Sequence, residues 1–109
     1  MSELARRKCV PCEGDFPALT KAQAGDFLPH VPGWEMNVEA KEISRDYTFP
    51  DFAEALAFVD KVGALAEEEG HHPDIVLSWG KVGIRLSTHA VKGLSENDFI
   101  LAAKIDLLD

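Results

Sequence analysis

The feature that most constrains the fold is the sequence Gly-His-His-Pro at residues 70–73, which separates a helical pattern from a strand pattern. Glycine commonly follows the end of a helix, because it adopts a left-handed conformation without steric cost. Proline cannot continue a helix, and it biases the residue before it toward an extended conformation. The break therefore predicts a helix that ends at Glu69 and a strand that begins at Asp74.

The segment before this break has the period of an amphipathic helix. Pro50 suits the first helical position, and Asp51 adds a favourable charge to the first turn. Residues 67–69 are three glutamates, which oppose the helix dipole at this end, and such a local conflict can mark a functional site. The apolar stripe expected to face the core consists of Phe52, Leu56, Val59, Gly63 and Ala66, with Ala55 and Val62 beside it.

The rest of the chain supplies strands in pairs. Residues 74–79 and 82–88 read as a hairpin with one buried face, and residues 34–38 and 43–49 read as two earlier strands. Short helices are expected at residues 20–28, where Thr20 and Gln23 have capping-box spacing, and from Ser95 through Leu107. The order α-β-β-α-β-β-α predicts an α+β fold, a four-stranded antiparallel sheet with helices packed on one face.

Three of the four histidines, His71, His72 and His89, lie near the ends of the predicted helix and strand, so they could meet in one cleft. Histidine is both an acid and a base near neutral pH, which suits proton transfer, and three histidines can also bind zinc. Adjacent extended residues point in opposite directions, so His71 and His72 are awkward as joint metal ligands. His30 is expected to be a surface residue.

The spacing of these residues is more specific than their types. Glu67 is followed after three residues by His71-His72-Pro73, after five more by Trp79, after nine by His89 and after eight by Asp98. This pattern resembles the signature of the pterin-4a-carbinolamine dehydratases (4a-hydroxytetrahydrobiopterin dehydratases). The flanking sequence is similar to that of bacterial members of the family.

The resemblance implies a dehydratase that converts 4a-hydroxytetrahydropterin to quinonoid dihydropterin and water, with no metal and no other cofactor. It implies that the catalytic residues are His71, His72 and His89. His71 and His89 would act as general acid and base, His72 would bind and orient the pterin, and Glu67 would lie behind a histidine as its charge partner. The substrate-binding positions would be Trp34, Glu67, Gly70, Ser87, Thr88, Ala90 and Asp98.

Several of these positions have a second interpretation. Asp98 lies three residues after Ser95, so it can complete a helix capping box with or without a role in the site. Trp34 can be an anchor of the core or of a subunit interface instead of a stacking partner for the pterin. Vertebrate-type members of the family have carboxylates at the positions of Gly70 and Ala90, so pterin affinity could be weaker here unless Glu69 compensates.

The charge and hydrophobicity of the sequence limit the kinds of partner that the protein is expected to bind. The net charge of −8 disfavours nucleic acid, and no apolar run is long enough for a membrane span. The first residues lack the apolar core of a secretory signal, so we expect a cytoplasmic protein. The resemblance implies a homodimer or homotetramer and a possible phenylalanine hydroxylase partner. It also leaves open a regulatory role toward a hydroxylase, or service to another pterin such as the molybdenum cofactor pathway.

Residues 1–18 are expected to form an N-terminal arm, and residues 19–109 a single domain. The arm contains Cys9 and Cys12 in a CxxC arrangement. Two cysteines do not make a disulfide framework, and no second pair lies nearby to complete a zinc site. Reduced thiols are the favoured interpretation, with a zinc site completed elsewhere in the chain as the alternative.

Overall fold

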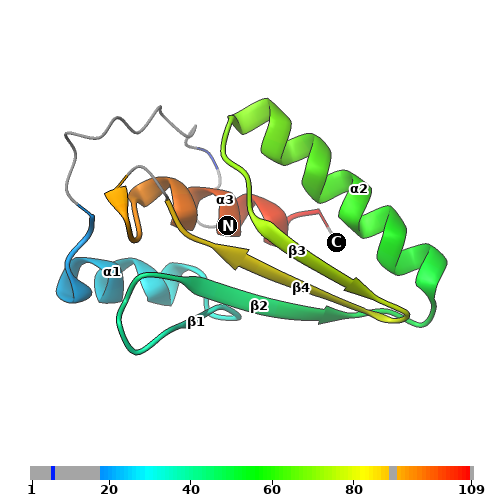
Figure 1. The fold of residues 1–109 in the computed structure, drawn as a ribbon, viewed down its shortest axis with the longest axis horizontal. Helices are drawn as coiled ribbons and strands as arrows, with labels where there is room; N and C mark the ends of the chain where they lie inside the picture. Colours follow the sequence, from blue (N-terminus) through cyan, green and yellow to red (C-terminus); the bar gives the residue numbers. More distant parts are fainter. Residues whose placement is uncertain (1–5, 7–17, 89–90, 109) are drawn as a thin grey trace.

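The computed structural model describes residue 6, residues 18–88 and residues 91–108. Over these residues, three α-helices and four strands follow one another in the order that the sequence predicts, α-β-β-α-β-β-α (Figure 1). They are α1 (Lys21–Phe27) with a short 3-10 turn after it (Leu28–His30), β1 (Glu35–Met36), β2 (Ile43–Thr48), α2 (Phe52–Glu69), β3 (Asp74–Ser78), β4 (Lys81–Leu86) and α3 (Glu96–Asp106).

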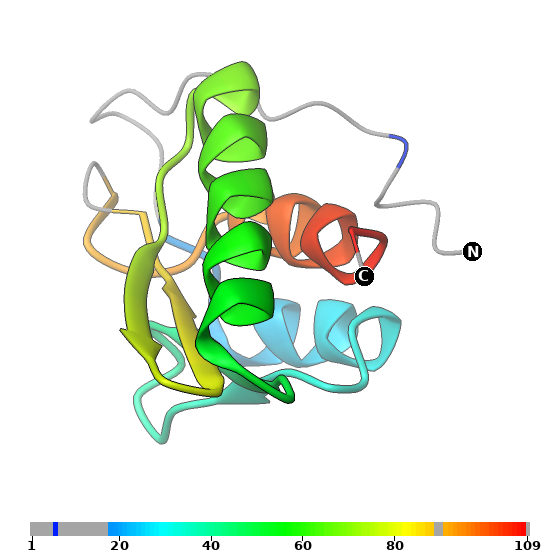
Figure 2. The same cartoon turned by 90° about the vertical axis from the view of Figure 1, so that its right-hand side faces the viewer.

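The four strands form one antiparallel sheet in the order β1-β2-β4-β3. Figure 2 shows the helices together on one side of this sheet, with α2 in front of α1 and α3. The register pairs Ile43 with Leu86 and Tyr47 with Val82, and these four side chains are buried on the helix side. The predicted fold class, an α+β layout with helices on one face of the sheet, is confirmed.

Helix ends follow the local rules closely. Thr20 and Gln23 form the expected capping box, with reciprocal hydrogen bonds of 2.9 and 3.1 Å between side chain and backbone. Gly70 ends α2 with a left-handed backbone at φ +66°. The start of α2 differs from the prediction by two positions, since Asp51 is the N-cap and Pro50 precedes it. The reason is that the Asp51 carboxylate accepts a hydrogen bond from the Glu54 amide at 2.8 Å.

The buried face of α2 is rotated from the predicted stripe and shares with it Ala66 and the flanking Ala55 and Val62. Ala55, Phe58, Val62 and Ala66 face the sheet, whereas Phe52 is 44% exposed and Leu56 is 41% exposed. Phe58 determines this orientation, because its ring packs 4.7 Å from the Tyr47 ring and 5.2 Å from the Phe49 ring. Both stripes have helical spacing, and only the position of β2 selects between them.

Strand lengths also differ from the prediction. β1 has only two residues, because the Asn37 side chain accepts hydrogen bonds from the amides of Lys41 and Glu42 and so starts the turn early. The other strands end one or two residues earlier than expected. After β4 the chain turns instead, and the Thr88 amide donates to the Gly93 carbonyl at 2.7 Å.

Candidate active site around His71 and Asp98

The candidate site lies where the end of α2 meets the start of α3. His71 follows the left-handed Gly70, and its Nε2 lies 2.6 Å from Oδ1 of Asp98 in the first turn of α3. The His71 side chain is 12% exposed, and the Asp98 side chain is fully buried. With Asp98 as a carboxylate, which can only accept, the proton of this bond resides on Nε2 of His71. Among the described residues nothing bonds the other ring nitrogen, Nδ1.

Asp98 is held on its second oxygen as well. Oδ2 accepts a hydrogen bond from the Thr88 hydroxyl at 2.8 Å and from the Ser95 amide at 2.9 Å, and the hydroxyls of Thr88 and Ser95 are 2.7 Å apart. The Ser95 amide bond is the Asp98 half of the expected capping box. The carboxylate therefore caps α3 and holds His71 at the same time, so the two interpretations of Asp98 are compatible.

His72 and Glu67 form a second pair beside the first. Nε2 of His72 lies 2.6 Å from Oε2 of Glu67, and the two side chains are 61% and 78% exposed. Glu67 thus lies behind a histidine as expected, and that histidine is His72. The acid that faces His71 is Asp98, which is distant in sequence and which spacing alone does not link to His71.

The remaining candidate residues are distributed differently. Thr88 is buried against Asp98, and Ser87 is half-buried next to it. Trp34 is buried, and its indole N–H donates to both oxygens of Asp106 at 3.1 and 3.2 Å. Asp106 lies eight residues after Asp98, about 12 Å along α3. Within one chain, Trp34 is therefore bound to the other end of the helix that holds His71. His89 and Ala90 lie outside the described residues, as do Cys9 and Cys12.

Sequence reasoning missed two residues that organise the surroundings of the site. Asp106 accepts hydrogen bonds from Trp34, Arg45 and Tyr47, and the Arg45 guanidinium lies 4.7 Å from the centre of the Tyr47 ring. This accounts for Arg45 on an otherwise apolar strand face. Lys104, also on α3, pairs with Glu69 at the end of α2. The only local sequence signal for Asp106 was the charged Arg45 on an apolar strand face. The only local signal for Lys104 was its own charge on the largely buried α3.

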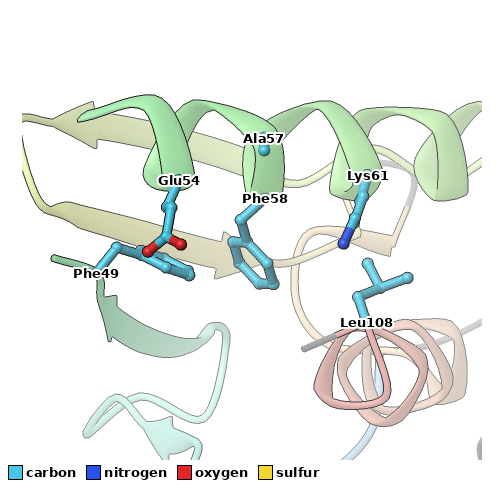
Figure 3. Close-up of a pocket in the computed structure, with 6 residues that line it drawn as sticks. All are labelled: Phe49, Glu54, Ala57, Phe58, Lys61 and Leu108. Atoms are coloured by element: carbon cyan, nitrogen blue, oxygen red, sulfur yellow. The ribbon is translucent and has the colours of Figure 1, made fainter. Parts of the chain in front are cut away.

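Two hollows of the described surface lie away from the histidine pairs. One cavity of about 260 Å³ lies at the start of α2 (Figure 3), lined by Phe49, Glu54, Ala57, Phe58, Lys61 and Leu108. Glu54 is thirteen residues from Glu67, roughly 20 Å along the helix. Another hollow, of about 330 Å³, lies over the sheet face opposite the helices, around Gly83. The histidine pairs belong to neither.

Within residues 18–88 and 91–108, no group of three or more His, Cys, Asp or Glu side chains is placed to hold a metal ion. Three of the residues that a metal site would need, His89, Cys9 and Cys12, are not among the described ones, so the absence of a metal stays a prediction. The described helices include none that is long and apolar enough to cross a lipid bilayer.

Comparison with known proteins identifies the family to which the chain belongs. The family model described as pterin 4 alpha carbinolamine dehydratase matches residues 17–108, which include both histidine pairs and Asp98. The chain belongs to the pterin 4 alpha carbinolamine dehydratase family. Two members provisionally named pterin-4-alpha-carbinolamine dehydratase are similar over nearly their whole length. The protein of Methylococcus capsulatus is 49% identical over 96% of this chain and 92% of its own, and that of Rubrobacter xylanophilus is 47% identical over 99% and 100%.

Solved structures of dehydratase-like proteins share the fold. A transcriptional coactivator/pterin dehydratase from Brucella melitensis superposes with a TM-score of 0.78 at 28% identity, covering 84% of this chain and 97% of its own. A pterin dehydratase-like protein identified as a RuBisCO assembly factor in the alpha-carboxysome has a TM-score of 0.61 at 28% identity, covering 70% and 88%. The pterin dehydratase fold is thus found in proteins with different described roles.

Proposed function

We propose that this protein dehydrates 4a-hydroxytetrahydropterin to quinonoid dihydropterin, and that it recycles the pterin cofactor of an aromatic amino acid hydroxylase. The step breaks the bond between C4a and the hydroxyl oxygen. That oxygen takes a proton and leaves as water, while N5 supplies the electron pair of the new double bond to C4a and loses its own proton. One proton enters and one leaves, so the step requires no oxidant or reductant.

The observation that carries this proposal is the hydrogen bond between His71 and the fully buried Asp98. A carboxylate that accepts from one nitrogen of an imidazole fixes the ring orientation and the tautomer. Nε2 is then committed to Asp98, and Nδ1 is the nitrogen that exchanges a proton with the substrate. The partial exposure of His71 is compatible with a ring that is held from inside the protein and meets a ligand from outside.

The other site residues divide by burial. Thr88 and Asp98 are 4% and 0% exposed, which favours a positioning role over direct contact with the pterin. His72 and Glu67 are largely exposed, which suits binding and orientation of the pterin ring through its own donors and acceptors. His89 is proposed as the second acid-base group, on the strength of its place in the family motif.

The test is a direct assay with 4a-hydroxytetrahydropterin generated by a hydroxylase in the same cuvette, with the uncatalysed dehydration subtracted. Replacement of His71 or His89 by Ala is expected to lower the catalysed rate by ~10²-fold or more, the scale of general acid-base catalysis. A His30→Ala variant, outside the motif, is the matched control and should keep the full rate. Wild-type rates in both histidine variants would refute the assignment.

We further propose that the protein is a cytoplasmic homodimer or homotetramer. Strand β3 is an edge strand of the sheet, and Val76 on it is 61% exposed. Exposed apolar side chains on α2, Phe52 and Leu56, give a second surface that association would cover. Light scattering that returns a 12 kDa monomer at micromolar concentration would contradict this proposal.

A second candidate is a non-catalytic binding role, toward a hydroxylase or another protein. The structural neighbour described as a RuBisCO assembly factor favours it, because that protein has a similar fold and a protein-assembly role. Service to a different pterin, such as the molybdenum cofactor pathway, also remains a candidate. A protein that binds its partner equally well with and without His71, and that adds nothing to the uncatalysed dehydration, would have the binding role.

A further inference from the structure

Glu69 is in an unfavourable place for an acid. It is the last residue of α2, where the helix dipole disfavours negative charge, and its side chain is only 3% exposed. A carboxylate removed from water needs a compensating partner. One partner is Lys104 in the last turn of α3, whose side chain is 17% exposed and whose Nζ lies 3.7 Å from Oε2 of Glu69.

Among the described residues, this pair joins the end of α2 to α3. The bond between His71 and Asp98, at 2.6 Å, joins the same two helix regions at a second place. Asp98 and Lys104 are six residues apart on α3, so the two attachments are separated by about 9 Å along that helix. On the α2 side only Gly70 stands between Glu69 and His71. One attachment would leave the His71 segment able to pivot, whereas two separated attachments also fix its direction.

A contribution to folding stability does not by itself explain why this buried ion pair is present. The cost of removing two charges from water offsets much of their attraction, so a buried ion pair is weak support for stability. The best-attested use of buried charges is to select one arrangement of packed elements over others. Here the pair would select the packing of α2 on α3 that places Asp98, in the first turn of α3, in contact with His71.

We infer that Glu69 and Lys104 are positioning residues that hold the His71 ring on Asp98 in the orientation that proton transfer requires. This rests on the proposed function for its catalytic consequence only, since the geometric part concerns the His71–Asp98 bond itself. Neither residue has to touch the pterin. The pair would act through the direction of the His71 segment.

The decisive variant is Glu69→Gln with Lys104→Met, which removes both charges of the pair at similar volume. The first readout is nitrogen-resolved NMR of the His71 ring. Exchange of its Nε2 proton with water is expected to be at least tenfold faster than in the wild type, because the bond to Asp98 opens more often. The second readout is kinetic, with kcat expected to fall ~10- to 100-fold while KM changes little, since a misplaced group weakens the chemical step.

Two controls accompany it. Lys104→Arg retains the charge pair and should give the wild-type exchange rate of the His71 Nε2 proton and the wild-type kcat. Lys81→Met with Asp46→Asn removes an ion pair of 3.4 Å on the outer face of the sheet, whose side chains are 56% and 63% exposed, and should leave both readings unchanged. If the decisive variant does not fold, Glu69→Gln alone replaces it, because the long Lys104 side chain can extend its charge to the surface.

An unchanged exchange rate of the His71 Nε2 proton overturns the inference, even if the melting temperature falls, because the pair is then only structural. Faster exchange with a lower kcat supports it. If the wild-type protein shows no dehydratase activity at all, the proposed function fails, and the NMR reading still decides by itself whether the pair positions His71.

Discussion

Replacement of Asp98 by Asn tests the central contact of the site with the smallest change of shape. The carboxylate is fully buried and accepts hydrogen bonds from His71, Thr88 and Ser95. An amide oxygen can still accept from Thr88 and Ser95, but the amide nitrogen then faces Nε2–H of His71, donor against donor. Loss of a hydrogen bond to a charged group costs about 1.5–3 kcal/mol, and loss of the negative charge in the first turn of α3 costs about 0.3–1 kcal/mol more.

The sum is about 2–4 kcal/mol of unfolding free energy, which for a domain of this size corresponds to a melting temperature lower by roughly 10–20 °C. Calorimetry and urea titration measure the loss. The dehydration rate at a temperature where the variant is folded should fall ~10- to 100-fold, because His71 must turn or change tautomer. Asp46→Asn, at an exposed carboxylate, is the matched control and should change neither quantity appreciably. Asp98→Asn with wild-type stability and rate would refute this account of the site.

The remaining predictions concern the scaffold and the metal. Phe58→Ala should cost about 3–5 kcal/mol of unfolding free energy by urea titration, whereas Leu56→Ala, at an exposed position, should cost under about 1 kcal/mol. Gly70→Ala should cost about 1–2 kcal/mol because of its left-handed backbone, and Gly70→Asn should cost less, so a larger loss for Asn would contradict the strain argument. Exhaustive chelation should leave dehydratase activity intact. Activity that disappears with chelator and returns with stoichiometric zinc would overturn the metal-free mechanism.

Much of the local structure could be predicted because it depends on neighbours in sequence. The capping box of Thr20 and Gln23, the left-handed end of α2 at Gly70 and the turn after β3 are all set within a few residues. The family could be predicted too, since its motif is a set of spacings along residues 67–98 that tertiary structure does not alter. The element order then led to the correct fold class.

Other features were beyond sequence reasoning because they depend on contacts between distant segments. Two apolar stripes of α2 have equally good helical spacing, and the packing of Phe58 on Tyr47 and Phe49 selects one of them. The early end of β1 depends on the direction of the Asn37 side chain.

The candidate site shows the same division. Sequence alone was sufficient to predict the residue types of the candidate site, because the chemistry of imidazoles and carboxylates is a property of the side chains themselves. Tertiary structure decided that His71 pairs with Asp98, His72 with Glu67 and Glu69 with Lys104. Several acids surround the histidines in sequence, and no spacing rule links His71 or Glu69 at the end of α2 to a particular residue of α3. The partners of His71 and Glu69 were selected only when the two helices packed together, because such a contact requires two atoms within about 3–4 Å, a condition that the folded chain alone meets.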